Sequence, residues 1–194
     1  KNYDDPFDPD NDATALVMEK LKLFREVSWA TDFFKTGVWA TSYDITASDV
    51  VWSDWASSDP IGNHETAREA IYSVTGKEPN KVLYGRGVWR YLKHHPDLLE
   101  RIKYTQKAIL TTELVGSLLE IPKVYVGKAI KTATIEGQAS QTYSYIYGNH
   151  ALMMYTPDRP GLRTPTAGYT FHWKQFGGIS YIRRVRDDKA QYDR

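Results

Sequence analysis

Several features that would point to particular functions are missing from this sequence. It contains no cysteine, which excludes disulfide bonds, thiolate nucleophiles and thiolate metal ligands. No apolar run reaches the ~18 residues that a membrane-spanning helix needs, and the first residues do not show the basic-then-apolar pattern of a signal segment. The net charge is +1, from 25 basic and 24 acidic residues, so no overall field attracts nucleic acid or an anionic membrane.

Motifs of known catalytic sites are missing as well. The sequence contains no GxSxG nucleophile elbow, no phosphate-binding Walker loop and no evident pair of acid and base carboxylates. Its 194 residues have an ordinary globular composition, 41% hydrophobic and 25% charged, which suits one compact domain or two small lobes. Six Trp and 14 Tyr make a heavy aromatic load, which favours assembly, although a well-filled core is the commoner explanation.

The hydrophobic pattern changes from helical to strand-like near residue 121. Apolar spacing and capping residues predict helices over residues 13–35, 59–75, 86–95, 96–103 and 111–120, and one short strand over residues 81–84. Farther on, alternation predicts strands near residues 124–130, 143–147, 151–155, 169–173 and 179–185, with a proline-rich loop over residues 156–168. Helices that precede strands indicate an α+β fold rather than alternating βαβ units.

Two of these helices combine an apolar stripe with a capping residue. Asp12 is the expected N-cap of the first helix. Asp59 before Pro60 is expected to cap the second, with Asn63 as the alternative and Gly76 as the stop. The expected buried stripes are Leu16, Leu23, Phe24, Val27, Ala30 and Phe34 in the first helix, and Ala67, Ala70, Ile71 and Val74 in the second. The second stripe is narrow, which predicts a helix that lies across a surface.

The turn Gly85-Arg86-Gly87-Val88-Trp89-Arg90 imitates a dinucleotide fingerprint, because it follows a predicted strand and opens a predicted helix. However, Arg90 stands where the third Gly would let helix and strand pack closely. The next strand, with its acidic residue, is not evident about 20 residues farther on. A tight corner between strand and helix is therefore the favoured interpretation. The alternative is a nucleotide-binding module or enzyme that uses Gly85 and Gly87.

Two metal-binding patterns are incomplete. The spacing of Asp8, Asp10, Asp12 and Glu19 matches a calcium loop, but Ala13 takes the place of its required Gly. His64-Glu65 begins like a zinc-protease helix, with Arg68 in place of the second His. Hydrogen-bonded or surface roles are expected for these and the remaining histidines, His94, His95, His150 and His172. The sequence therefore predicts no metal site, no cofactor and no catalytic residue.

A basic run near the end of the chain is the last candidate site. Arg183, Arg184 and Arg186 lie on a predicted strand and could contact nucleic acid. Asp187 and Asp188 follow immediately, so a solvated strand edge is the favoured interpretation.

Four segments occur in a characteristic order. They are FFKTGVW at residues 33–39, the stretch 52–104 containing GKEPNKVLYGRGVWRYLKHHPDLL, IPKVYVGKAI at residues 121–130 and TAGYTFHW at residues 166–173. None of them encodes chemistry, but their order and spacing are specific. Together they resemble the major capsid proteins of tailed bacteriophages with the Hong Kong 97-type fold.

The resemblance implies a peripheral domain and an axial domain. The peripheral domain would take residues 1–80 and 174–194, with helix 59–75 as its long spine helix beside a thin antiparallel sheet. The axial domain, a sheet flanked by helices, would take residues 81–173. Full-length family members also have an N-terminal arm, an extended loop and a further C-terminal segment, so the resemblance implies that this chain is a folded core without them.

The function implied by the resemblance is structural rather than enzymatic. The chain would be the icosahedral shell subunit of a phage or prophage, made in the bacterial cytoplasm and located in the virion. Copies of the full-length protein would assemble into pentamers and hexamers that enclose DNA, with a scaffolding protein or protease as further partners. Neither specific nucleic-acid recognition nor a membrane is implied, and the core alone is compatible with a monomer.

Overall fold

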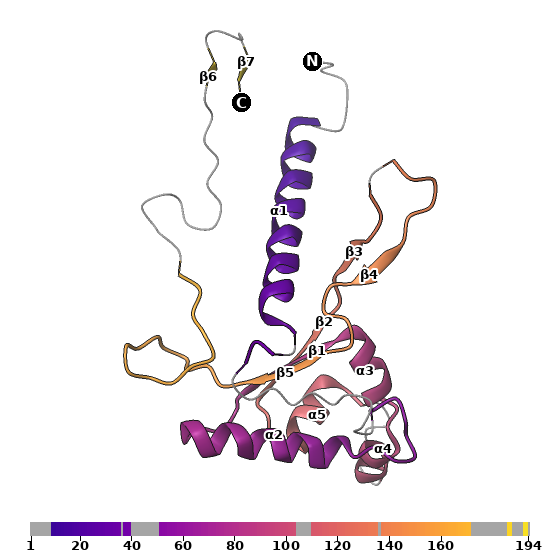
Figure 1. Ribbon diagram of the computed structural model, residues 1–194, viewed down its shortest axis with the longest axis vertical. Coiled ribbons are helices and arrows are strands. Elements are labelled where there is room, and N and C mark those ends of the chain that lie inside the picture. The colour runs from indigo at the N-terminus through magenta and orange to yellow at the C-terminus, as the bar shows by residue number, and fades with distance from the viewer. Residues whose placement is uncertain are drawn as a thin grey trace.

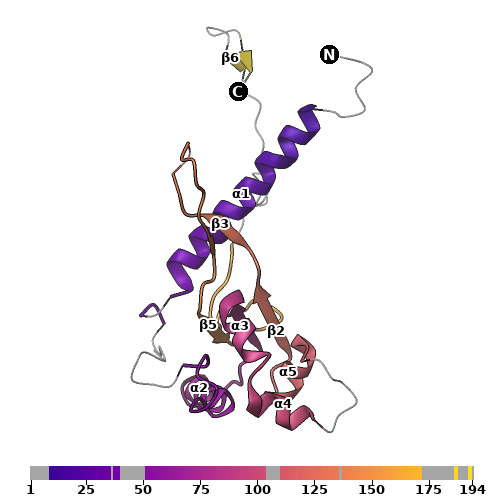
Figure 2. The same cartoon turned by 90° about the vertical axis from the view of Figure 1, so that its right-hand side faces the viewer.

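The computed structural model describes residues 9–35, 37–39, 51–103, 110–135, 137–171, 186–187 and 192–193. Helix α1 (Pro9–Phe33) and a hairpin of β3 (Ile130–Thr132) and β4 (Tyr143–Tyr145) extend from one side of a small sheet. Helix α2 (Pro60–Thr75) and two short helices, α4 (Pro96–Ile102) and α5 (Thr112–Leu118), lie at the other side (Figures 1 and 2). Within the described residues, no helix is long and apolar enough to cross a membrane.

The central sheet has three strands in the order β2-β1-β5. Strand β1 (Lys81–Gly85) pairs in parallel with β2 (Lys123–Gly127) and antiparallel with β5 (Ala151–Met154). The connection from β1 to β2 contains α3 (Arg86–Leu92), α4 and α5. The α+β prediction is correct in its mixture of helices and strands, but the hydrophobic pattern did not predict this parallel pair. Strand β2 begins only at Lys123, after three helices, much later than the fingerprint expects.

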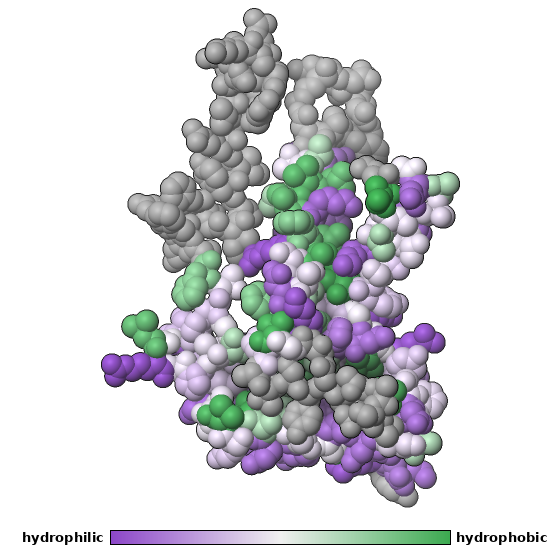
Figure 3. All heavy atoms as spheres, in the orientation of Figure 1, coloured by the Kyte–Doolittle hydropathy of each residue, from purple (hydrophilic) through white to green (hydrophobic). Residues whose placement is uncertain are grey.

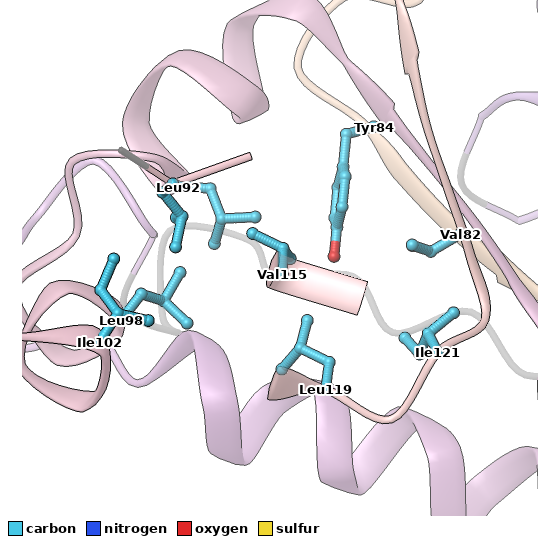
Figure 4. Packing of buried hydrophobic residues seen from close by; sticks show 9 residues of the cluster. Val82, Tyr84, Leu92, Leu98, Ile102, Val115, Leu119 and Ile121 are labelled. Carbon is cyan, nitrogen blue, oxygen red and sulfur yellow. The ribbon is translucent and has the colours of Figure 1, made fainter. Parts of the chain in front are cut away.

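A hydrophobic cluster holds the crossover helices against the sheet (Figure 4). Its buried members are Val82, Tyr84, Leu92, Leu98, Ile102, Leu110, Val115, Leu119 and Ile121. They come from β1, from all three crossover helices and from the corner before β2. Since full burial of one aliphatic side chain is worth about 1.5–3 kcal/mol, this cluster is the main stabilising element of the lobe.

Helix α1 departs from its predicted start and from its predicted stripe. It begins at Pro9, a residue favoured in the first turn, so Asp12 lies inside the helix and is not its N-cap. Only the last part of the stripe is covered, where Ala30 and Phe34 pack with Tyr147. Phe24 is 72% exposed, and apolar side chains are visible along the helix (Figure 3). The full stripe is not buried because the described lobe contacts only the end of α1.

Helix α2 confirms its predicted ends. The Asp59 carboxylate accepts a hydrogen bond from the Gly62 N–H at 2.8 Å, and Gly76 takes the left-handed conformation with φ of 63°. The predicted stripe is wrong at Val74, which is 79% exposed. The buried residues of the helix are instead Pro60 and His64. The predicted stripe missed this inward face because it was drawn from Ala, Ile and Val side chains alone.

The second half of the chain is less regular than predicted. The β3–β4 hairpin aligns Ile130 with Tyr145, and residues 156–168 form neither helix nor strand, as predicted. Residues 169–171 are not a strand, which corrects the prediction for the described part of residues 169–173. The predicted strand 179–185 lies outside the described residues. Two short strands, β6 (Arg186–Asp187) and β7 (Tyr192–Asp193), pair with each other near the end of the chain.

Candidate functional sites around strand β1

The glycine turn lies between β1 and α3, where the alternative function would place a phosphate. The backbone of Gly85 is extended, with φ of −65° and ψ of 152°. The Gly85 N–H donates a hydrogen bond to the carbonyl oxygen of His150 at 2.8 Å. The parallel β1–β2 pair makes the surroundings of the turn more similar to a nucleotide-binding site than the sequence suggested. The atoms that lie against the two glycines distinguish a phosphate-binding loop from a structural corner.

The segment between β4 and β5 occupies that position. A Cβ atom on Gly85 would collide with the carbonyl oxygens of Tyr147 and Gly148, and one on Gly87 would collide with Oδ1 of Asn149. Because the chain itself lies against these glycines, they permit close packing of one backbone on another. The geometry thus favours the predicted structural corner over a phosphate-binding loop.

The incomplete calcium pattern does not form a loop. Asp10, Asp12 and Glu19 all lie in α1, and Asp8 is outside the described residues. A continuous helix holds Asp12 and Glu19 two turns apart, about 10 Å along its axis, whereas a calcium loop folds its ligands around one point. Within the described residues, no group of three or more His, Asp and Glu side chains is placed to hold a metal ion.

His64 is a buried, hydrogen-bonded residue of α2. Its Nδ1 faces the carbonyl oxygen of Pro60, and its Nε2 lies 2.6 Å from the Tyr84 hydroxyl. Its ring stacks on Trp52 with centroids 4.8 Å apart. A carbonyl can only accept, so Nδ1 carries the proton and Nε2 accepts from Tyr84. Burial lowers the pKa of His64, against the opposing effect of the hydrogen bond to Pro60.

His95 is fully buried at the start of α4 and caps that helix. Its Nδ1 accepts a hydrogen bond from the Asp97 N–H at 3.3 Å, and its Nε2 lies 2.8 Å from Oγ of Ser58. The Ser58 hydroxyl in turn donates to the carbonyl of Asp54 at 2.6 Å. An Nδ1 that accepts must be unprotonated, so the proton sits on Nε2 and is donated to Ser58.

The three residue types of a serine-hydrolase triad lie close together at this point, as Ser58, His95 and Asp97. Their spacing in the sequence did not predict this proximity. The proton positions exclude that role in this arrangement. A catalytic His must accept the serine proton, but His95 donates to Ser58. The Asp97 carboxylate lies 3.6 Å from Nδ1, too far for a hydrogen bond, and Ser58 is buried away from substrate. The three residues therefore hold chain segments together.

The other histidines and the basic run provide no site among the described residues. His94 and His150 are exposed, and the His150 ring contacts Phe34. His172, Arg183 and Arg184 lie outside the described residues, and only the backbone of Arg186 is described, in β6.

One ion-pair group and two open grooves lie beside α2 and α5. Arg68 contacts Glu120 at 2.7 Å, Glu78 at 3.3 Å and Glu65 at 3.8 Å, which ties α2 to the corner before β2. Glu120 adopts a positive φ of 55°, which is unusual for a residue other than glycine. One open groove, of about 930 Å³, runs along α2, and another, of about 620 Å³, lies beside α5. In these grooves the hydroxyls of Thr66, Ser73 and Ser117 donate to backbone carbonyl oxygens of their own helices.

Comparison with known proteins relates the chain to a phage capsid protein and to a phage-related protein of known structure. No protein-family model matches the chain. The chain is 33% identical over 141 residues to the major capsid protein of Burkholderia phage BcepMu, in an alignment that covers 70% of this chain and 44% of the capsid protein. The crystal structure of a phage-related protein from Bordetella bronchiseptica RB50 is similar, with a TM-score of 0.59 and 29% identity, over 72% of this chain and 43% of that one.

This chain therefore spans less than half the length of each of these two proteins. The resemblance to phage major capsid proteins is confirmed by the capsid relative, and the mixed α+β architecture agrees with that of the phage-related protein.

Proposed function

We propose that this chain is part of the structural subunit of a phage or prophage capsid, and that copies of the native protein assemble into an icosahedral shell around DNA. The observation that carries the proposal is the 33% identity to the BcepMu major capsid protein over 141 residues. A relationship of that extent spans most of the chain, not a short shared motif.

The chemistry of the chain is consistent with a structural role. A shell subunit needs a rigid lobe and extensive contacts with its own copies, and it needs no active site. At the best candidate catalytic site, His95 donates a proton to Ser58 and therefore cannot accept the serine proton as a catalytic base. The net charge of +1 suits a protein that encloses DNA without recognising its sequence.

The finer architecture belongs to the same proposal. We assign the chain to the Hong Kong 97-type fold, with α2 as the spine helix of the peripheral domain. Residues 81–173, which contain the three-stranded sheet, form the axial domain, and residues 1–80 and 174–194 belong to the peripheral domain. The parallel β1–β2 pair and the buried cluster between the strands and their crossover helices support grouping residues 81–127 in one domain.

The partners follow from the role. Copies of the native protein would form pentamers and hexamers, helped by a scaffolding protein or a maturation protease. They would be made in the bacterial cytoplasm and would end in the virion.

The test is the assembly state of the native gene product. After expression in bacteria, electron microscopy of the purified protein should show capsomers or closed shells. If only small monomers appear across protein concentration, salt and added scaffolding protein, the proposal is wrong.

The nucleotide-binding alternative makes a different prediction. NAD or ATP at millimolar concentration would raise the melting temperature of this chain by binding its folded state. The packed turn at Gly85 and Gly87 predicts no shift.

A further inference from the structure

Residues 51–58, which lead the chain into α2, are held by two buried contacts. Most of the side chains in this segment are exposed, and the exceptions are Trp52 and Ser58. Trp52 stacks on His64 and meets the edge of Tyr84, and Ser58 is hydrogen-bonded to His95. Each of these two side chains therefore contacts a histidine, His64 in α2 for Trp52 and His95 at the start of α4 for Ser58.

Both contacts require neutral histidines, with opposite tautomers. His64 needs its proton on Nδ1 so that Nε2 can accept from Tyr84. His95 needs its proton on Nε2 so that Nδ1 can accept from the Asp97 N–H. A second proton on His64 would point at the Tyr84 hydroxyl, which would have to turn its own hydrogen away inside the core. A second proton on His95 would point at the Asp97 N–H.

The charged surroundings differ between the two histidines. The groups around His64 are the Tyr84 hydroxyl from β1, the Trp52 ring from residues 51–58 and the Pro60 carbonyl from α2. Within the described part of the chain, no carboxylate forms an ion pair with His64, and the nearby Arg68 of α2 is engaged with Glu120. His95 has the Asp97 carboxylate at 3.6 Å, which can offset part of an added charge. Among the described residues, His64 has no such carboxylate in an ion pair with it.

From this geometry we infer that residues 51–58 form an acid-released latch, closed while His64 is neutral and opened when His64 takes up a proton. Opening removes Trp52 from the face of the His64 ring and lets water hydrate the imidazolium. The buried members of the hydrophobic cluster all lie outside residues 51–58, and Trp52 packs against them only as a partly buried side chain, so we expect the cluster to stay packed when the segment opens. The inference does not depend on the proposed capsid function.

The direction of the pH effect follows from proton linkage. In the closed state burial lowers the pKa of His64, whereas in the open state the hydrated ring returns to about 6.5. The closed state binds fewer protons, so above pH 6.5 the latch is unaffected, and below it opening becomes more favourable until the closed-state pKa is reached. Between pH 7.5 and pH 5.5 the opening constant should rise by up to about tenfold from this one histidine.

Hydrogen exchange followed by mass spectrometry tests the latch in this chain. Rates at pH 7.5 and pH 5.5, corrected for intrinsic exchange, should show a roughly tenfold rise in opening for peptides covering residues 51–58. Peptides from β1 and α4 should keep their protection. His64→Gln should remove the pH response. His94→Gln, which changes an exposed histidine next to His95, should preserve it.

The wild-type protein also provides a test that does not rely on a variant folding. The His64 Cε1–H resonance, followed by NMR through the same pH range, should titrate below the ordinary value for histidine. An ordinary titration would overturn the inference. So would a wild-type opening constant that does not change between the two pH values, or a His64→Gln variant with the full wild-type response.

Discussion

Replacing Gly85 with Ala tests the packed turn that separates the structural interpretation from the nucleotide-binding one. The backbone angles of Gly85 are allowed for every residue, so alanine meets no torsional penalty there. The whole effect comes from the new methyl group, which would overlap the carbonyl oxygens of Tyr147 and Gly148. Because both obstacles are backbone atoms, neither can move by a simple side-chain rotation.

The expected loss of stability is the sum of two contributions. Forcing one extra carbon into packed structure costs typically 1–3 kcal/mol. Moving the segment before β5 also weakens the hydrogen bond from the Gly85 N–H to the His150 carbonyl, worth about 1 kcal/mol. The free energy of unfolding should therefore fall by about 2–4 kcal/mol.

Urea unfolding followed by circular dichroism measures this quantity. Gly168→Ala is the matched control, because it has no positive φ and no atom within 4 Å of the added carbon. The control should lie within about 0.5 kcal/mol of the wild type or be slightly more stable. If Gly85→Ala behaves like Gly168→Ala, the close approach of residues 147–148 to this turn is wrong.

Gly87 extends the test, because the obstacle there is a side chain. A Cβ atom on Gly87 would collide with Oδ1 of Asn149. Gly87→Ala should therefore destabilise the wild type but cost much less in an Asn149→Ala background, with a coupling of about 1 kcal/mol or more in a double-mutant cycle. Additive effects would contradict the contact.

Three further substitutions have definite expected outcomes in the same urea assay. Asp59→Ala removes the carboxylate that accepts from the Gly62 N–H, and should cost about 1 kcal/mol; no loss would mean that the cap is not used. Leu98→Ala empties a fully buried position and should cost about 2–5 kcal/mol, and a smaller cost would contradict its burial. Tyr84→Phe keeps the ring but leaves Nε2 of His64 without its donor, so a cost of about 1–3 kcal/mol is expected, and a neutral result would refute that hydrogen bond.

Local signals predicted the elements whose ends depend on nearby residues. Helix α2 starts after Asp59 and stops at Gly76 because a carboxylate cap and a left-handed glycine act within one turn of the helix. Strand β1 was predicted to within one residue for the same reason, since a glycine turn follows its short apolar run. The start of α1 was misjudged because Asp12 and Pro9 both favour a helix beginning, and the pattern alone does not rank them.

Longer-range features could not be predicted in this way. The parallel pairing of β1 with β2 joins segments separated by three helices, and nothing in either strand specifies its partner. His95 was missed as a helix cap because histidine is not among the residues usually expected there. The available signal was the sequence His95-Pro96-Asp97 at the start of a predicted helix, because it places Nδ1 of His95 near the free N–H of Asp97.

The glycine turn shows why such a motif misleads in a structural protein. A phosphate and a protein backbone both present oxygen atoms that need close approach, and a glycine permits that approach for either one. The sequence Gly85-Arg86-Gly87 therefore indicates only that oxygen atoms lie close to this turn, and not whether they belong to a phosphate or to the protein. In this chain the oxygen atoms belong to Tyr147, Gly148 and Asn149, which lie far along the sequence. Short motifs could not distinguish these cases, whereas the order of segments across the chain pointed correctly to a capsid relative.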